Sequence, residues 1–312
     1  PAPFKRITYA ESMLKYGTDK PDLRNPLIIE DLSDFFKEID FMPFKNKPVR
    51  GIVAPECASK SKSFFEKMLA FATEIGMKGL GYISILTGME LKGPIVKFIS
   101  EEKQKELIEK LSLKENDTLF FISDVAKLVD KFAGQIRTEL GNRLEIIDKS
   151  KFEMCFIVDF PMFGINEETN KIEFTHNPFS MPQGEMEALE TMDPLDIKAY
   201  QYDIVCNGVE LSSGAVRNHK PEVMVKAFET AGYSKNDVEE NFSALYNAFH
   251  YGAPPHAGMA PGLDRIVMLL TEQESIREIV AFPMNSNAQD LLLGAPSAVT
   301  EQQLREVHIK LR

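Results

Sequence analysis

The sequence predicts an α+β protein in which an antiparallel sheet flanked by helices is accompanied by a smaller inserted α+β domain. From about residue 29 to 142, strand-like apolar runs alternate with amphipathic helical patterns, as in a compact domain of its own. From Phe152 onward the strand-like runs are longer and turns dominate, and Met154 to Phe160 is the clearest buried strand, stopped by Pro161. These patterns predict three segments, namely 1–28, an inserted domain at 29–142, and 143–312.

The composition is that of a globular, acidic protein. Its 312 residues are 44% hydrophobic and carry a formal net charge of −11, enough apolar material for two domains. The charge argues against indiscriminate nucleic-acid binding, which needs clustered Lys and Arg. No apolar run approaches the roughly 18 residues that cross a bilayer, so no membrane association is predicted and the cytoplasm is the expected compartment. Cys57, Cys155 and Cys206 form no C-x-x-C pair, and we expect them to be reduced packing residues.

The first segment reads as a short helix that a charged loop follows. Thr8 and Glu11 have the spacing of a capping box, and Gly17 is placed to end the helix. The loop runs from Thr18 to Arg24. The inserted domain groups few polar residues for chemistry, so a binding or spacing role is favoured there over a catalytic one.

The strongest local signal for a functional site is a predicted hairpin. Asn207-Gly208 is a type I′ turn dipeptide, and a two-residue loop would place Val205 opposite Glu210 and Asp203 opposite Ser212. Asp203 and Glu210 then project from one face as diagonal neighbours, with Cα atoms roughly 7 to 8 Å apart. Two solvated carboxylates on an open sheet would be an ordinary alternative, but this spacing also suits one divalent cation.

Arg217 follows seven residues after Glu210, on what should be the next stretch of the same sheet. An Arg beside carboxylates is usually a salt-bridge partner. The other interpretation is a planar fork that binds a ligand carboxylate with two hydrogen bonds. Periodicity alone leaves both interpretations open.

A third element begins at His256, where glycines and a proline lead into a predicted helix. Its apolar residues Leu263, Ile266, Val267 and Leu270 follow the helical repeat, which puts Arg265 in the first turn, away from the core. An Arg is unfavourable at this positive end of the helix dipole unless an anion binds there. The element therefore predicts an anion site.

His176 lies in a turn after a strand-like segment, in Phe174-Thr-His176-Asn177-Pro178-Phe179. A lone His near a turn is most often a surface or packing residue. The remaining histidines show no H-x-x-x-H or other metal spacing. No transition-metal site is predicted.

These stretches together resemble the class II aminoacyl-tRNA synthetases, and most closely their bacterial aspartyl branch. Gly262-Leu263-Asp264-Arg265, leading into an apolar helix, resembles the third sequence motif of that class. The run from Tyr202-Asp203 through Glu210 to Arg217 is more specific, and Tyr16 to Arg24 and His176 to Phe179 also follow the aspartate enzymes. The resemblance spans essentially the whole chain.

The resemblance implies the class II fold, with 1–28 and 143–312 in the catalytic domain and 29–142 as the bacterial insertion domain. It implies ATP and Mg²⁺ as cofactors. Glu210 and Asp203 would serve ATP and its magnesium, and Arg265, within Gly262 to Arg265, would bind the terminal phosphates. Arg217 would bind the side-chain carboxylate of aspartate. His176 would lie against the amino acid or the adenylate.

The implied reaction is the activation of L-aspartate to aspartyl-adenylate and its transfer to the 3′ end of tRNA(Asp), with tRNA(Asn) left open as a second acceptor. The family's anticodon-binding domain and its first two motifs are not visible, and the chain opens with Pro1-Ala2-Pro3. We therefore expect a C-terminal half that is inactive in isolation and belongs to a homodimeric full-length enzyme. The alternative is a synthetase-derived binding module without catalysis.

Overall fold

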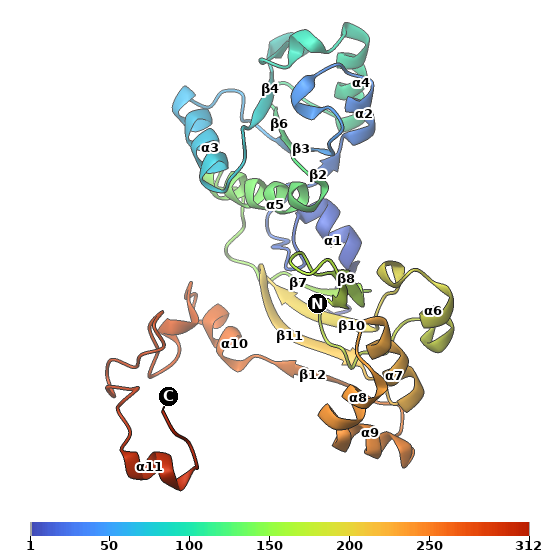
Figure 1. Ribbon diagram of the computed structural model, residues 1–312. Helices are drawn as coiled ribbons and strands as arrows, with labels where there is room; N and C mark the ends of the chain where they lie inside the picture. The colour runs from blue at the N-terminus through green and yellow to red at the C-terminus, as the bar shows by residue number, and fades with distance from the viewer. Residues whose placement is uncertain (1, 312) are drawn as a thin grey trace. The chain divides into compact units, whose positions relative to one another are not determined.

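The computed structural model describes residues 2 to 311 (Figure 1). The chain divides into two compact units, Pro1–Ala260 and Pro261–Arg312. Within the described residues, no helix has the length and apolarity that a bilayer crossing requires. The predicted α+β class is confirmed, because the first unit contains two five-stranded sheets with helices packed against them.

The main sheet of the first unit has the strand order β1-β7-β10-β11-β12. β1 pairs in parallel with β7, whereas β7 with β10 and β10 with β11 are antiparallel, so the sheet is not purely antiparallel. Its core on one face gathers Ile7, Cys155, Ile157, Phe160 and Val205. The strands are β1 (Lys5–Thr8), β7 (Met154–Val158), β10 (Gln201–Cys206), β11 (Val209–Val216) and β12 (Ala257–Pro261).

Helices and a small hairpin surround this sheet. Helix α7 packs against α6, α8 and α9, and the hairpin β8–β9 shares a buried cluster with α6 and α7. The elements are α6 (Glu185–Thr191), α7 (Pro221–Thr230), α8 (Lys235–Asn241), α9 (Ser243–His250), β8 (Phe163–Ile165) and β9 (Ile172–Phe174).

The second sheet is antiparallel and has the order β2-β3-β6-β4-β5. One face packs on α3 and α5 and the other on α2 and α4, so each face has its own apolar core. This sheet and its helices occupy the part of the chain for which the sequence predicts an inserted domain. They are β2 (Ile29–Asp31), β3 (Val49–Ala54), β4 (Gly81–Ile85), β5 (Leu91–Lys92), β6 (Thr118–Ser123), α2 (Ser33–Lys37), α3 (Lys62–Glu74), α4 (Glu101–Leu111) and α5 (Ala126–Arg143).

Helix α1 (Tyr9–Tyr16) begins and ends where the sequence predicts. The Thr8 side chain accepts a hydrogen bond from the Glu11 amide at 3.2 Å, and Gly17 ends the helix in the left-handed region, with φ of 70°.

Cys57, Cys155 and Cys206 are buried free thiols, as predicted. In the second unit, α10 (Leu263–Leu270) and α11 (Glu301–Glu306) are the α-helices among residues 261–311.

The end of α1 touches helix α5 through glycine. A Cβ placed on Gly134 would lie 2.6 Å from the carbonyl oxygen of Gly17, closer than any ordinary contact. Figure 1 shows α5 between the second sheet and α1. The absence of both side chains lets the two backbones meet.

Gly134→Ala should therefore destabilise the protein. Alanine improves the helix propensity of α5 by about 1 kcal/mol, but overpacking against the rigid backbone of Gly17 costs about 1 to 3 kcal/mol. We expect a net loss in the free energy of unfolding, measured by urea denaturation. Gly79→Ala, where a Cβ meets nothing within 4 Å, is the control, and equal stability of both variants would contradict the close contact.

Candidate active site

The hairpin β10–β11 carries the two carboxylates that the sequence singles out. Asn207 and Gly208 both have positive φ, 53° and 83°, as a type I′ turn requires. Val205 lies opposite Glu210, as predicted. The turn is held from outside, because the Asn207 side chain accepts a hydrogen bond from the Glu153 amide at 2.9 Å and donates one to the Lys151 carbonyl at 3.0 Å.

The predicted partner of Asp203 is wrong by one residue. Asp203 pairs with Ser213 and not with Ser212, because the register shifts between Ile204 and Val205. The shift leaves Leu211 as an extra residue on β11, which is the arrangement of a β-bulge. A turn-based register cannot anticipate such a shift.

Despite the bulge, Asp203 and Glu210 line one open cavity of about 540 Å³. His176 lines it as well, so three of the residues singled out from the sequence come together. The remaining lining comes from the first loop, from the turn after His176 and from β10 and β11. These residues are Asp19, Lys20, Asn177, Pro178, Phe179, Gln201 and Ser213.

Aromatic packing fixes the position of His176. Its ring lies edge-on to Phe160 at 4.9 Å between centroids and to Tyr9 at 6.2 Å. The following turn closes through the Asn177 side chain, which accepts a hydrogen bond from the Phe179 amide at 2.9 Å. Partial burial lowers the pKa of His176.

Asp203 is buried in an unusual state. Its side chain is only 4% exposed, and its Oδ1 atom has no hydrogen-bond partner among the described residues. Burial, reinforced by the nearby charge of Glu210 and opposed by Ser213, raises the pKa of Asp203 to about 6. An ionised carboxylate in this position lacks compensation, so a cation at this point would be stabilising.

Lys20 is the cationic side chain of the cavity. Its Nζ lies 2.7 Å from Asp19 and 3.5 Å from Glu210. The hydrogen bonds and charges of these two carboxylates raise the pKa of Lys20 against the opposing effect of burial. With three carboxylates and one ammonium around it, the cavity is anionic overall and suited to a ligand with positive charge.

Arg217 does not line this cavity. It lies just after β11 and lines an adjacent cavity of about 290 Å³ with His256 and Gly258, and Phe179 borders both cavities. Its amide donates to the His256 carbonyl at 2.9 Å. The guanidinium forms no ion pair or hydrogen bond with any side chain between residues 2 and 311, so the structure does not support the salt-bridge interpretation.

Arg265 lies in the second unit, in the first turn of α10, as predicted. Gly262 is the residue before that helix, and Leu263 and Asp264 are its first two residues. The expected apolar face is only partly right. Ile266 and Val267 of the predicted face are half-buried, whereas Leu263 and Leu270 are 72% and 68% exposed. The buried residue is Met268, which the predicted face did not include.

Sequence reasoning assigned no role to several residues of the cavity. Asp19 and Lys20 were visible only as part of a charged loop, and Gln201 and Ser213 as parts of strands. The alternation of β10 could have suggested Gln201, because it lies two residues before Asp203 and therefore on the same face. Nothing local could have placed Lys20 beside Glu210.

The arrangement has definite chemical capabilities. Asp203 and Glu210 offer carboxylate oxygens of the kind that Mg²⁺ binds together with substrate phosphates. Among residues 2–311 no three His, Cys, Asp or Glu side chains cluster in a metal-binding arrangement.

Comparison with known proteins identifies the family. The sequence model described as tRNA synthetases class II (D, K and N) matches residues 1–286. The chain is 55% identical to an aspartate-tRNA(Asp/Asn) ligase of Paramagnetospirillum magneticum and 54% identical to one of Zymomonas mobilis, over 100% of its length. It covers 36% and 53% of those proteins. An aspartyl-tRNA synthetase structure from Entamoeba histolytica aligns over 78% of this chain and 44% of that one, at 19% identity and a TM-score of 0.35. On the family match and these identities, the chain belongs to the class II tRNA synthetases of the D, K and N group.

Proposed function

We propose that the complete protein carrying this chain is a cytoplasmic aspartate-tRNA ligase that uses ATP to convert L-aspartate to aspartyl-adenylate and then esterifies tRNA(Asp). The observation that carries the proposal is the joint lining of one cavity by His176, Asp203 and Glu210 in a chain of this family. The relatives' names include tRNA(Asn), which supports tRNA(Asn) as a second acceptor. A homodimer is part of the proposal, and so is the division into a catalytic domain (1–28 and 143–312) and an insertion domain (29–142).

Arg217 is proposed to select the amino acid. Its guanidinium is unpaired within residues 2–311, and two charge-assisted hydrogen bonds from it would bind the aspartate side-chain carboxylate. Asparagine would bring N-H groups against Arg donors and leave both unsatisfied. His176 lies in the neighbouring cavity, against which the amino acid or adenylate is proposed to pack.

Asp203 and Glu210 are proposed to hold Mg²⁺ together with ATP. The buried oxygen of Asp203 that lacks a partner and the raised pKa of this carboxyl both fit a cation there. When bound, the magnesium would neutralise phosphate charge. Gly262, Leu263, Asp264 and Arg265 are proposed to bind the terminal phosphates, because free amides and a positive dipole end favour anions.

The proposed reaction needs no covalent enzyme intermediate. The α-carboxylate oxygen of aspartate attacks the α-phosphorus of ATP, and the bond to pyrophosphate breaks. A ribose hydroxyl of the tRNA then attacks the mixed anhydride carbonyl, and AMP leaves. The contribution of the chain is orientation and charge stabilisation.

The alternative function is a synthetase-derived binding module without catalysis. Amino-acid-dependent exchange of pyrophosphate into ATP by the complete protein distinguishes the two. We expect exchange with aspartate and none with lysine or asparagine. If none of the amino acids supports pyrophosphate exchange, the binding module is favoured.

Arg217→Leu should abolish aspartate activation while ATP still binds. Arg217→Lys should be nearly as damaging, because an ammonium cannot form the planar fork. A site built on such polar pairing discriminates by roughly 10⁴ or more, so we expect the wild-type preference for aspartate over asparagine to be of that order. Exchange with each amino acid and ATP affinity are measured in parallel, and an Arg217→Leu variant that still prefers aspartate would show that the carboxylate is bound elsewhere.

Arg265→Ala should lower the activation rate by about 10² to 10³, by analogy with removing one charge-stabilising donor. Arg277→Ala is the matched control, because Arg277 is an exposed arginine in the same unit, in the short 3-10 helix Ile276–Glu278. The measurement is single-turnover formation of the adenylate. Near-normal rates in the Arg265 variant would remove this residue from the ATP site.

The pKa of Asp203 predicts a pH-dependent stability difference. Because the folded pKa of about 6 lies above the ordinary aspartate value of 3.8, ionisation destabilises the fold. This destabilisation is absent below about pH 4 and complete above about pH 6. Asp203→Asn should thus raise the melting temperature at pH 7.5 more than at pH 4.5. Asp196→Asn, at an exposed carboxylate, is the control, and a pH-independent difference would contradict the assignment.

A further inference from the structure

Arg137 of helix α5 is a buried cation whose hydrogen bonds all go to one segment of the main chain. Its side chain is 1% exposed. Its Nε donates to the carbonyl of Leu27 at 2.6 Å, and its Nη2 donates to those of Asp22 at 3.0 Å and Asn25 at 2.7 Å. All three acceptors belong to residues 18–28, the connecting segment between α1 and β2.

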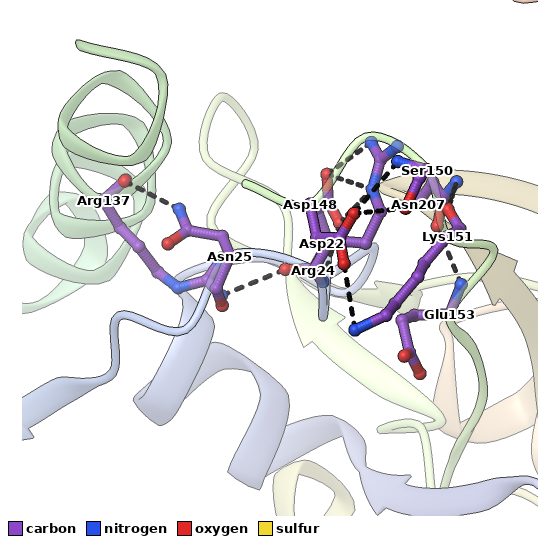
Figure 2. Close-up of polar contacts among 9 residues, drawn as sticks. All are labelled: Asp22, Arg24, Asn25, Arg137, Asp148, Ser150, Lys151, Glu153 and Asn207. Carbon is purple, nitrogen blue, oxygen red and sulfur yellow. Dashed lines mark hydrogen bonds and ion pairs between the residues drawn. The ribbon is translucent and has the colours of Figure 1, made fainter. Parts of the chain in front are cut away.

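Two further contacts bind the connecting segment to α5. The Asn25 side chain donates to the carbonyl of Arg137 at 2.9 Å (Figure 2), and it packs so closely on Gly141 that a Cβ there would collide with it. At the start of the segment, Gly17 meets Gly134 on the same helix face. Glycines and an arginine spaced along one helix thus hold the segment at several points.

The other side of the connecting segment faces the candidate active site. Asp19 and Lys20 line the cavity with His176 and Glu210. Asp22 packs against the tip of the hairpin, where a Cβ on Gly208 would lie 3.5 Å from the Cβ of Asp22. Arg24 holds the Asp22 carboxylate through Nε and Nη2, at 3.0 and 2.8 Å (Figure 2). The segment therefore lies between α5 and the carboxylate-bearing hairpin.

The cost of burying the Arg137 guanidinium indicates that this residue does more than fill space in the core. A buried guanidinium is costly, and burial lowers the pKa of Arg137 to about 10. An apolar side chain of similar volume would avoid that cost. The planar guanidinium donates to three carbonyls of one loop along fixed directions, and so fixes the path of that loop.

We propose that Arg137 is a positioning residue that holds the connecting segment so that Lys20 and Asp19 stay in the cavity, which couples the second sheet's domain to aspartate activation. This inference rests on the proposed function. The Nζ of Lys20 lies 3.5 Å from Glu210, and the backbone of residues 18–28 sets where this side chain begins. Displacements of about 1 Å at a catalytic site can cost 10²-fold in rate, so loosening the segment should be felt in catalysis.

The first test measures hydrogen exchange in the chain itself. In Arg137→Met, amides of residues 18–28 should exchange at least about tenfold faster while those of β6 stay protected, because the loss is local. Arg143→Met is the matched control, because Arg143 is on the same helix but bonds only to Glu139 among residues 2–311. Unchanged exchange at 18–28 in Arg137→Met would overturn the proposal, and so would equal acceleration in both variants.

The second test measures aspartate-dependent pyrophosphate exchange by the complete protein. Arg137→Met should lower kcat/KM for aspartate by about 10- to 100-fold, and Arg137→Lys by nearly as much, since an ammonium lacks the fork. The key readout is the double variant with Lys20→Met. If Arg137 acts through the position of Lys20 and Asp19, the loss in the double variant should be smaller than the product of the two single losses. An independent structural loss would instead multiply with the loss of Lys20→Met.

A milder variant keeps the proposal testable if Arg137→Met does not fold. Asn25→Ala removes the bond to the Arg137 carbonyl, a cap on the Leu27 amide and the packing on Gly141, and leaves Arg137 in place. The same non-additivity with Lys20→Met is expected. Multiplicative effects in either pair would overturn the inference. If the wild-type complete protein shows no aspartate-dependent pyrophosphate exchange, the proposed function is refuted. The hydrogen-exchange result then decides by itself whether Arg137 holds the connecting segment.

Discussion

The placement of a carboxylate inside a sheet is the constraint on which the candidate site depends. Asp203 lies on the central strand β10, between β7 and β11, and one of its carboxylate oxygens has no hydrogen-bond partner in the described part of the chain. Such a group destabilises the fold whenever it is ionised without a cation. The neighbouring Glu210 adds a like charge, and Lys20 partly balances it. Lys20, which partly balances these charges, belongs to a loop about 190 positions before Glu210 in the chain.

The need to place Lys20 beside Glu210 gives a reason for the many contacts that hold the connecting segment. A loop that begins with Gly17 and ends at β2 would otherwise be free to move, since loops are the least protected parts of a protein. Arg137, Asn25 and the Gly17–Gly134 contact fix it from one side and the hairpin tip from the other. The part of the chain expected to be a spacing or binding module thus contributes one helix to the surroundings of the site. A domain with few catalytic groups can still determine where such groups lie.

Features that depend on residues close together in the sequence were predicted correctly, whereas features that depend on distant residues were not. Turn and cap chemistry is local, so the Asn207-Gly208 turn, the Thr8 cap and the helix start at Leu263 were all predictable. The bulge that moves Asp203 to Ser213 was not, because β7 pairs with β10 on its other edge and no Gly or Pro marks the shift. The burial of Arg137 could not be predicted either, because the carbonyls that accept its hydrogen bonds lie more than 100 residues earlier in the chain. The roles of His176, Asp203, Glu210, Arg217 and Arg265 stay predictions.

The division of charge between the two cavities matches the chemistry of the proposed substrate. The larger cavity offers three carboxylates against one ammonium. The adjacent one is lined by Arg217, whose guanidinium has no side-chain partner among residues 2–311, and Phe179 borders both. Aspartate carries one ammonium and two carboxylates, so an amino acid spanning the two would place opposite charges in opposite surroundings. Lysine would bring a second ammonium toward Arg217, and asparagine would bring N-H groups with no acceptor. The proposed role of Arg217 beside an anionic cavity would accordingly favour aspartate over lysine and asparagine.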